Sequence, residues 1–163
     1  MKVILVSILL ILSVNAYSQN QIEAINKDVW FNFMQAYQDL DASLFNQIHT
    51  DDVLRIPEES GNMMIGQEYK DANLENFNRW NLAQVKQRIQ FSFISRIQKG
   101  NWAYETGIYK LIRYTDSGSQ SYYGKFHVTL KKTSGVWKIF IDSDSSNGGT
   151  IGEEDFNRGK ILK

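Results

Sequence analysis

The second half of the sequence constrains the fold most, because it reads as four long strands joined by three short turns. The turns contain Lys99-Gly100, Asp116-Ser117-Gly118 and Ser134-Gly135, residue types that favour reversal of the chain. Between the turns, apolar residues alternate with polar ones, as in strands that bury one face. Residues 86–144 are therefore predicted to form an antiparallel meander whose apolar face needs a covering layer.

The first half of the sequence supplies helices for that layer. Apolar residues recur at steps of three and four over residues 21–40, which predicts one amphipathic helix. Asp41 is placed to cap a second, short helix that ends near Ile48. A third helix, with its aromatic residues on one side, is expected over 67–81.

A short strand is predicted between the second and third helices, over residues 53–56, where Pro57 stops it. A polar turn containing Gly61 would join it as a hairpin to 63–65. The expected fold class is therefore α+β, with three N-terminal helices packed into the concave side of a strongly curved antiparallel sheet.

Pairing the long strands across their turns assigns each residue to one of two faces, because opposed residues share a side. The inner face predicted in this way has no aspartate or glutamate; its residues are Ile89, Phe91, Phe93, Ile97, Trp102, Tyr104, Ile108, Ile112, Phe126, Val128, Leu130, Trp137, Ile139 and Ile141. The predicted outer face is polar and consists of Arg88, Arg96, Glu105, Tyr109, Arg113, Tyr123, Lys125, His127, Lys131, Lys138, Phe140 and Asp142.

Composition excludes several classes of protein. The chain of 163 residues has 18 lysines and arginines against 18 aspartates and glutamates, so it lacks the basic surplus of a nucleic-acid-binding protein. It has no cysteine, which excludes disulfides, thiolate catalysis and cysteine-ligated metal sites. No cofactor is expected. The length suits one domain, predicted over 19–144, followed by a C-terminal tail with a short helix over 145–163.

The N-terminus predicts export to the periplasm or the medium. Lys2 is followed by an apolar run from Val3 to Val14, and the small residues Ala16 and Ser18 suit cleavage after Ser18. Such a run is too short to span a bilayer, so no stable membrane insertion is expected, with an N-terminal anchor as the alternative. Residues 1–18 are thus predicted to be a signal peptide.

The order helix, helix, short hairpin, helix and four-stranded meander resembles the nuclear-transport-factor-2-like superfamily. Trp30 and Tyr37 on the first helix and the segment 135–139 in the last strand support the resemblance, and the segments 40–45 and 50–53 are similar to the junction found in the SnoaL-like branch. The resemblance implies a conical, strongly curved sheet that encloses a pocket. Members include isomerases, dehydratases, cyclases, non-catalytic ligand binders and association domains, so it implies no single activity.

The two histidines are candidates for general acid–base chemistry. The expected register puts His127 opposite Tyr109 and on the same face as Glu105, which makes these three residues one catalytic hypothesis. That face is the polar one, so structural roles are the alternative. His49 ends the second helix, either as a surface residue or as an acid or base at the pocket edge beside the neighbouring aspartates.

A ligand pocket is expected where the first helix faces the sheet. Large aromatic side chains there are typical both of a core and of a pocket wall, and buried tyrosine hydroxyls need a partner. Arg55 would provide a buried handle for an anion if its side chain turned inward. The residues predicted to line the pocket are Trp30, Met34, Tyr37, Arg55, Phe91, Tyr104 and Trp137.

The segment 144–155 partly matches a calcium-binding loop, with Asp144, Ser146 and Asp155 as candidate ligands. The match has Gly148 at a ligand position and a strand in place of the entering helix. A glycine turn followed by a capped short helix is the alternative interpretation, so no metal is assigned.

These observations favour an exported domain that binds a small hydrophobic molecule in a mostly apolar pocket. A lyase, isomerase or cyclase of the SnoaL-like kind is the enzymatic alternative, and a non-catalytic homodimeric association module is the third hypothesis. A homodimer is expected through the open face of the sheet, where apolar side chains interrupt the charged residues: Phe140, Tyr109, Tyr123, Ile94 and Leu111.

Overall fold

The computed structural model describes residues 20–163. The signal peptide predicted over residues 1–18 lies outside the described residues, so export stays a prediction. Within residues 20–163, no helix is both long enough and apolar enough to cross a membrane.

The helices predicted from the sequence are present. The first helix ends because Leu40 adopts a left-handed backbone conformation, with φ of 54°. The carboxylate of Asp41 then caps the next helix by accepting a hydrogen bond of 2.9 Å from the Leu44 backbone N–H. The helical elements are a helix from residue 20 with a π-helical turn (Asn26–Trp30), α2 (Phe31–Asp39), α3 (Ala42–Gln47) and α4 (Gln67–Leu82).

The strands of the described chain form one seven-stranded sheet in the order β2-β1-β6-β5-β4-β3-β7. Neighbouring strands are antiparallel except β1 and β6, which run parallel. The four long strands confirm the predicted meander. The strands are β1 (His49–Pro57), β2 (Met64–Ile65), β3 (Lys86–Lys99), β4 (Trp102–Thr115), β5 (Gly118–Thr133), β6 (Val136–Ser145) and β7 (Lys160–Ile161).

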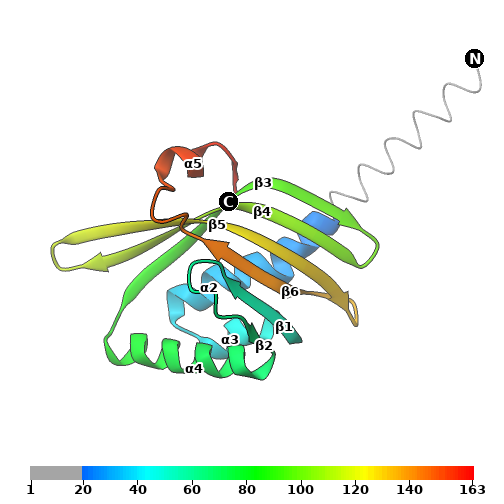
Figure 1. Cartoon of the computed structure of the whole chain (residues 1–163), viewed down its shortest axis with the longest axis horizontal. Coiled ribbons are helices and arrows are strands. Elements are labelled where there is room, and N and C mark those ends of the chain that lie inside the picture. Colours follow the sequence, from blue (N-terminus) through cyan, green and yellow to red (C-terminus); the bar gives the residue numbers. More distant parts are fainter. Residues whose placement is uncertain (1–19) are drawn as a thin grey trace, which may run out of the picture.

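The curved sheet carries α2, α3 and α4 on its concave side (Figure 1). The core fills the space between these two layers, as burial of the apolar face requires. The α+β fold class and the conical antiparallel sheet are thus confirmed. The largest fully buried apolar side chains of this core are Trp30, Trp137, Phe77, Phe91, Ile25, Leu130 and Ile139.

The C-terminal tail lies on the opposite, convex side of the sheet (Figure 1). There α5 (Glu153–Asn157) contacts β4 and β3, and β7 pairs with β3 as the edge strand of the sheet. Glu153 forms an ion pair of 2.5 Å with Lys110 of β4, while Phe156 is buried. The tail therefore covers part of the face expected to form a homodimer, and the homodimer stays a prediction.

The faces predicted for β4 are wrong, because the ladder is irregular on both sides of this strand. A β-bulge between Phe93 and Ser95 shifts the pairing of β3 with β4. The following turn is a two-residue loop in which Thr115 pairs with Gly118, which moves the β4–β5 register away from the expected one. The two shifts cancel at β5, whose inner residues are those predicted. On β4 the residues that share the inner face are Ala103, Glu105, Gly107, Tyr109, Leu111 and Arg113.

A second irregularity places acidic residues on the inner face. Between β5 and β6, Leu130 pairs with Ile139 but Thr129 pairs with Ile141, so Phe140 is an extra residue in β6. Beyond this bulge, Asp142 pairs with Val128 and Asp144 with Phe126, opposite to the predicted alternation. The expectation of an inner face without carboxylates is therefore wrong.

Candidate functional site

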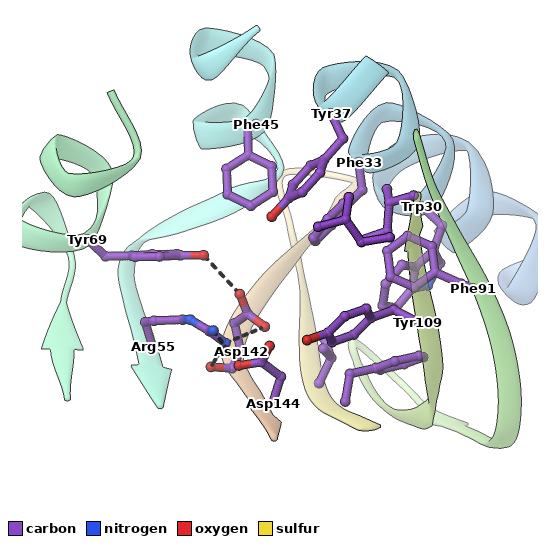
Figure 2. A pocket seen from close by; sticks show the side chains of 14 residues that line it. Trp30, Phe33, Tyr37, Phe45, Arg55, Tyr69, Phe91, Tyr109, Asp142 and Asp144 are labelled. Carbon is purple, nitrogen blue, oxygen red and sulfur yellow. Dashed lines mark hydrogen bonds and ion pairs between the residues drawn. The ribbon is translucent and has the colours of Figure 1, made fainter. Parts of the chain in front are cut away.

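A cavity of about 110 Å³ lies between the helices and the concave face of the sheet (Figure 2). Its wall is mostly aromatic, and a polar group of side chains closes one end. An engineered apolar cavity of about 150 Å³ in another protein binds benzene, so a void of this order accommodates a small organic molecule. The apolar lining consists of Trp30, Phe33, Phe45, Ile89, Phe91, Leu111, Phe126 and Val128.

The polar end of the cavity is built around Arg55. Its guanidinium lies 3.4 Å from Asp142 Oδ1 and forms a second ion pair with Asp144 (Figure 2). The Tyr69 hydroxyl of α4 donates a hydrogen bond of 3.0 Å to the other oxygen of Asp142. One guanidinium therefore holds two carboxylates at the cavity wall, as the planar fork of arginine allows.

The parallel pairing of β1 with β6 brings these groups together. Arg55 of β1 lies beside Asp142 of β6, and Pro57 beside Asp144. The bulge at Phe140 turns both aspartates toward the helices. The inward orientation of Arg55, which the sequence analysis left open, follows from this pairing.

The two carboxylates differ in the ease with which they ionise. Burial alone would raise the pKa of Asp142, but the Arg55 charge, His49 and the Tyr69 hydrogen bond outweigh it and lower that pKa to about 2. Burial raises the pKa of Asp144; the Arg55 charge opposes this, and the negative charge of Asp142 adds to it. Two carboxyl groups whose pKa values move apart suit different roles, with Asp144 as the one that can exchange a proton.

Two tyrosine hydroxyls complete the polar surface of the cavity. The Tyr109 hydroxyl interacts with the Asp144 carboxyl, whereas the Tyr37 hydroxyl has no hydrogen-bond partner within residues 20–163 and points into the cavity (Figure 2). Burial raises the pKa of both phenols, so both remain protonated at neutral pH. They can therefore donate hydrogen bonds to an oxygen atom of a bound molecule.

Asp142→Asn is expected to lower the free energy of unfolding by about 2 kcal/mol at pH 7. The pKa of Asp142 is about 2 in the folded protein and 3.8 for an unperturbed aspartate, which represents the unfolded chain. The ionised group therefore stabilises the fold above about pH 4. That contribution is lost as the pH falls through the folded pKa. Urea unfolding at several pH values should show the difference between variant and parent shrinking between about pH 4 and pH 2.

Asp52→Asn is the control for that measurement, because Asp52 lies on the neighbouring strand β1 but is exposed. It is expected to change stability by no more than about 0.5 kcal/mol at any pH. A constant difference between Asp142→Asn and the parent from pH 7 down to pH 2 would contradict the assigned ion pair.

Gly124 of β5 leaves the space in which the Tyr109 ring lies. A Cβ atom at Gly124 would come within 2.5 Å of the Tyr109 hydroxyl oxygen. Gly124→Ala is therefore expected to displace Tyr109 and to cost about 1–3 kcal/mol of stability. Urea unfolding of Gly124→Ala, Tyr109→Ala and the double variant measures this: the glycine substitution should cost much less without the tyrosine ring. Equal costs in both backgrounds would contradict the proposed contact.

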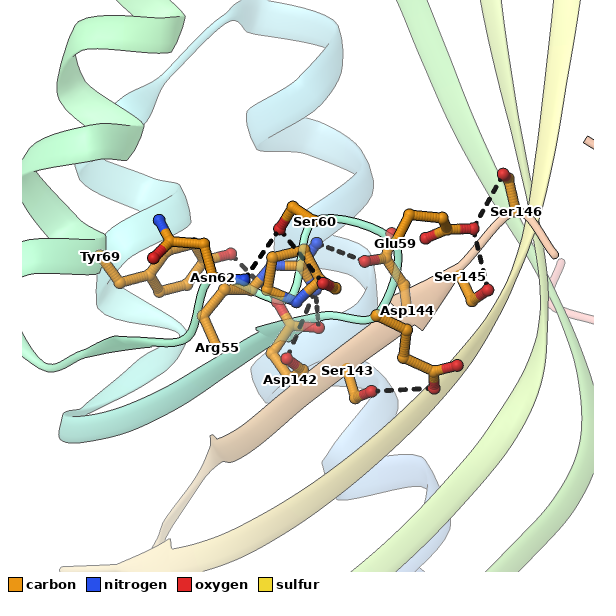
Figure 3. A network of polar contacts seen from close by, with 12 residues as sticks. Arg55, Glu59, Ser60, Asn62, Tyr69, Asp142, Ser143, Asp144, Ser145 and Ser146 are labelled. Atoms are coloured by element: carbon orange, nitrogen blue, oxygen red, sulfur yellow. Dashed lines mark hydrogen bonds and ion pairs between the residues drawn. The ribbon is translucent and has the colours of Figure 1, made fainter. Parts of the chain in front are cut away.

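The loop between β1 and β2 is joined to β6 beside the polar end of the cavity (Figure 3). Glu58 accepts a hydrogen bond of 3.2 Å from Ser143, and Glu59 accepts bonds of 2.9 Å from both Ser145 and Ser146. These hydroxyls lower the pKa of Glu59 to about 2, although the carboxylate is exposed. The loop is thereby held against the strand that carries both cavity aspartates.

His49 does not reach the cavity but lies behind Asp142. It is fully buried, with Nδ1 donating to the Phe45 carbonyl at 2.8 Å and Nε2 placed 3.7 Å from Asp142 Oδ2. No hydrogen-bond partner of Nε2 is found within the described residues. The prediction of a surface histidine is wrong, and the geometry gives His49 a supporting position rather than contact with a ligand.

The predicted group of His127, Tyr109 and Glu105 is divided between the two faces of the sheet. His127 faces outward, where its Nδ1 and the Tyr104 hydroxyl are 2.9 Å apart. Glu105 faces inward and is fully buried beneath Trp30, away from His127. Tyr109 alone of the three lines the cavity, so the three residues cannot act on one ligand.

Four of the seven predicted pocket residues line the cavity: Trp30, Tyr37, Arg55 and Phe91. Tyr104 is exposed on the outer face because of the β4 register, and Trp137 is a core residue outside the cavity. Met34 points to a shallow hollow on the surface beside Leu162. Asp142, Asp144 and Tyr69 were not predicted to line the pocket, and only the position of the β6 bulge could have identified the aspartates.

The three candidate calcium ligands point in different directions. Asp144 faces the cavity, and the Ser146 hydroxyl donates to Glu59. Asp155 accepts a hydrogen bond of 3.0 Å from the Gly152 backbone N–H and pairs with Arg158, which makes it a cap of α5. Within residues 20–163, no group of three or more histidine, cysteine or acidic side chains is arranged to hold a metal ion.

No family model matches the sequence, and no curated protein matches it. Solved structures match the fold. A protein of unknown function from Mycobacterium tuberculosis is 16% identical, with a TM-score of 0.68 over 80% of this chain and 73% of its own. An NTF-2-like protein of unknown function from Shewanella oneidensis MR-1 is 18% identical, with a TM-score of 0.62 over 77% of this chain and 98% of its own.

A scytalone dehydratase-like protein from Novosphingobium aromaticivorans is 15% identical, with a TM-score of 0.64 over 77% of this chain and 83% of its own. At these identities the likeness shows the fold alone. The resemblance inferred from the order of elements is thereby confirmed at the level of fold, which is nuclear-transport-factor-2-like.

Proposed function

From the nuclear-transport-factor-2-like fold and its aromatic cavity, we propose that this chain is an acid–base enzyme of the lyase or isomerase type. The substrate would be a small, mostly apolar molecule with a carbonyl oxygen. One observation carries the proposal: a carboxyl with a raised pKa, Asp144, shares the cavity wall with two protonated phenols and lies in an otherwise aromatic enclosure.

The roles follow from the contacts of each group. One oxygen of Asp144 is held by Arg55, and the other would take a proton from the carbon next to the substrate carbonyl. The electron pair of that C–H bond would move onto the carbonyl oxygen, where the free Tyr37 hydroxyl would donate a hydrogen bond to the developing enolate. Asp144 would then return the proton to a different carbon, or to a leaving group on the neighbouring carbon.

Asp142 and Arg55 would position Asp144 without exchanging protons themselves. Asp142 remains ionised because its pKa is about 2, and its negative charge favours a proton on Asp144. Arg55 prevents the pair of carboxylates from being uncompensated in a buried site. The site would therefore need two carboxylates: Asp144 to exchange the proton, and Asp142 to keep the pKa of Asp144 raised.

The solved structures with a similar fold support this proposal only in part. One of them is described as scytalone dehydratase-like, which is a lyase activity, and others are of unknown function. Export is included in the proposal on the strength of the sequence of residues 1–18 alone. A non-catalytic ligand-binding protein is the second candidate, favoured by the Arg55 ion pair, which would occupy Asp144 without any reaction.

Exchange of the α-protons of cyclohexanone in deuterium oxide, followed by proton NMR, tests the proposal. The ketone has one apolar ring and one carbonyl oxygen, as the proposed substrate class requires, and the reaction requires only a base and a donor to the oxygen. The parent protein is expected to accelerate exchange over buffer, and Asp144→Asn to return it to the buffer rate. The accelerated rate should rise with pH through an apparent pKa above the ordinary aspartate value, because the base is the ionised carboxyl.

Asp52→Asn serves as the matched control, since it removes an exposed carboxylate and should leave exchange unchanged. Circular dichroism of each variant separates loss of activity from loss of fold. Binding of cyclohexanone without accelerated exchange would favour the second candidate. Exchange that is equally fast in Asp144→Asn would contradict the assignment of the base.

A further inference from the structure

Within residues 20–163, three arginines face the concave side of the sheet, and one of them has no anionic partner. Arg55 pairs with Asp142 and Asp144, and Arg96 pairs with Glu105 at 2.8 Å. Arg113 of β4 makes no ion pair with any carboxylate within residues 20–163, although it is only partly exposed. A cation in such a position usually has a partner, because partial burial removes part of its hydration.

The surroundings of Arg113 hold its guanidinium in place. The guanidinium carbon lies 5.7 Å from the centre of the Trp80 ring and 5.9 Å from that of Tyr122. Its Nε donates a hydrogen bond of 3.4 Å to the side-chain oxygen of Gln87, whose amide nitrogen in turn donates to the Tyr37 carbonyl at 3.5 Å. Within the described residues, neither terminal nitrogen of the Arg113 guanidinium has a hydrogen-bond partner, so both are free to bind a ligand.

Arg113 belongs to the same face as the cavity. Tyr109, Leu111 and Arg113 alternate along the inner side of β4, which places Arg113 about 13 Å along the strand from Tyr109. Tyr109 and Leu111 both line the cavity, so the row of side chains leads from the polar end toward Arg113. The charge of Arg113 also acts on the Tyr37 hydroxyl, which lies in the cavity wall.

We propose that Arg113 is a binding site for a carboxylate group on the substrate, with Trp80 and Tyr122 packing against the adjoining apolar part. This inference rests on the proposed function and names its substrate class: an elongated apolar acid whose reacting carbon lies at the end of the molecule remote from its carboxylate. The planar fork of a guanidinium matches the two oxygens of a carboxylate.

The distribution of charge would set the orientation of such a substrate. At one end of the row, Asp142 and Asp144 share the single guanidinium of Arg55, so that end repels an anion when both carboxyls are ionised. At the other end, Arg113 presents an uncompensated positive charge. An anionic molecule would therefore bind with its carboxylate toward Arg113 and its neutral end toward Asp144.

Binding of 4-phenylbutyrate and of its neutral analogue 4-phenylbutan-1-ol, measured by isothermal titration calorimetry at pH 7, tests this assignment. The parent protein is expected to bind the acid at least about tenfold more tightly than the alcohol. Arg113→Gln should reduce the affinity for the acid to that for the alcohol. Arg88→Gln, which removes an exposed cation from β3, should leave the preference intact.

Equal affinities of the parent for the two compounds, or no binding of the acid, would overturn the proposal. A preference that survives in Arg113→Gln would also overturn it, because another cation would then hold the carboxylate. The same titrations in Asp144→Asn separate this inference from the proposed reaction. A preference for the acid there, with no Asp144-dependent proton exchange in the parent, would leave the carboxylate site standing and reject the enzyme.

Discussion

Replacing Trp137 with alanine is expected to lower the free energy of unfolding by about 3–5 kcal/mol. The side chain is fully buried, and the Lys132 ammonium lies 5.6 Å from the ring centre. The Trp137 backbone N–H donates a hydrogen bond of 3.0 Å to the Asp28 carboxylate of the first helix, so the helical layer and the sheet meet at this residue. Alanine would remove the transfer free energy of the ring and leave a cavity that packed neighbours cannot fill. Urea unfolding measures the loss.

Two further variants make this result specific. His127→Ala should change stability by less than about 0.5 kcal/mol, because its ring is on the outer face and its hydrogen-bond partner within the described residues is the exposed Tyr104. Trp137→Phe should cost less than alanine, because it keeps an aromatic ring and removes Nε1, a buried donor without a partner within residues 20–163. A larger loss for His127→Ala than for Trp137→Ala would show that the two faces of β5 and β6 are exchanged.

Glu105→Leu is expected to cost about 3–5 kcal/mol, since it removes one member of a buried ion pair. Glu105 is fully buried, where it accepts a hydrogen bond of 2.5 Å from Trp30 Nε1 and one of 2.8 Å from Arg96 Nε. Leucine has a similar volume but no acceptor, so both donors would lose their partner. The positive charge of Arg96 would also remain in a largely enclosed position.

The companion variant Glu105→Gln separates the hydrogen bonds from the charge. Burial raises the pKa of Glu105, against the opposing effect of Arg96, so the fold favours the neutral carboxyl more than water does. Glutamine is neutral and keeps an acceptor for Trp30 and Arg96. It should therefore destabilise much less than leucine in urea unfolding. Equal losses for the two variants would mean that the charge, and not the acceptor, holds this cluster together.

The sequence was sufficient to predict the helices, the short hairpin and the meander in their order, but not the C-terminal strand β7. Periodicities of three to four residues and of two residues are local properties, and so are the Asp41 cap and the glycine-containing turns. The four strands of the meander, the three helices and the short hairpin were found in this way. The order of these elements also led to the correct fold.

The candidate site was predicted only where the evidence was a helix face or a strand with an unbroken alternation. Trp30 and Tyr37 lie on the helix that covers the sheet, and Phe91 precedes the first bulge of its strand. Beyond a bulge, alternation reverses and the same reasoning assigns the wrong face. Glu105 and Tyr109 were therefore predicted on the outer face, and Asp142 as well.

By itself, the sequence determined which residues form helices and strands, because hydrophobic period, capping and turn chemistry act between near neighbours. The tertiary structure decided which side chains meet in the cavity. Two bulges and one two-residue turn set the face of β4 and of the end of β6, and the parallel pairing of β1 with β6 brought Arg55 to Asp142. A one-residue change of register costs little locally but moves every later side chain to the other face. Only the packing of the whole sheet against its helices selects between these registers.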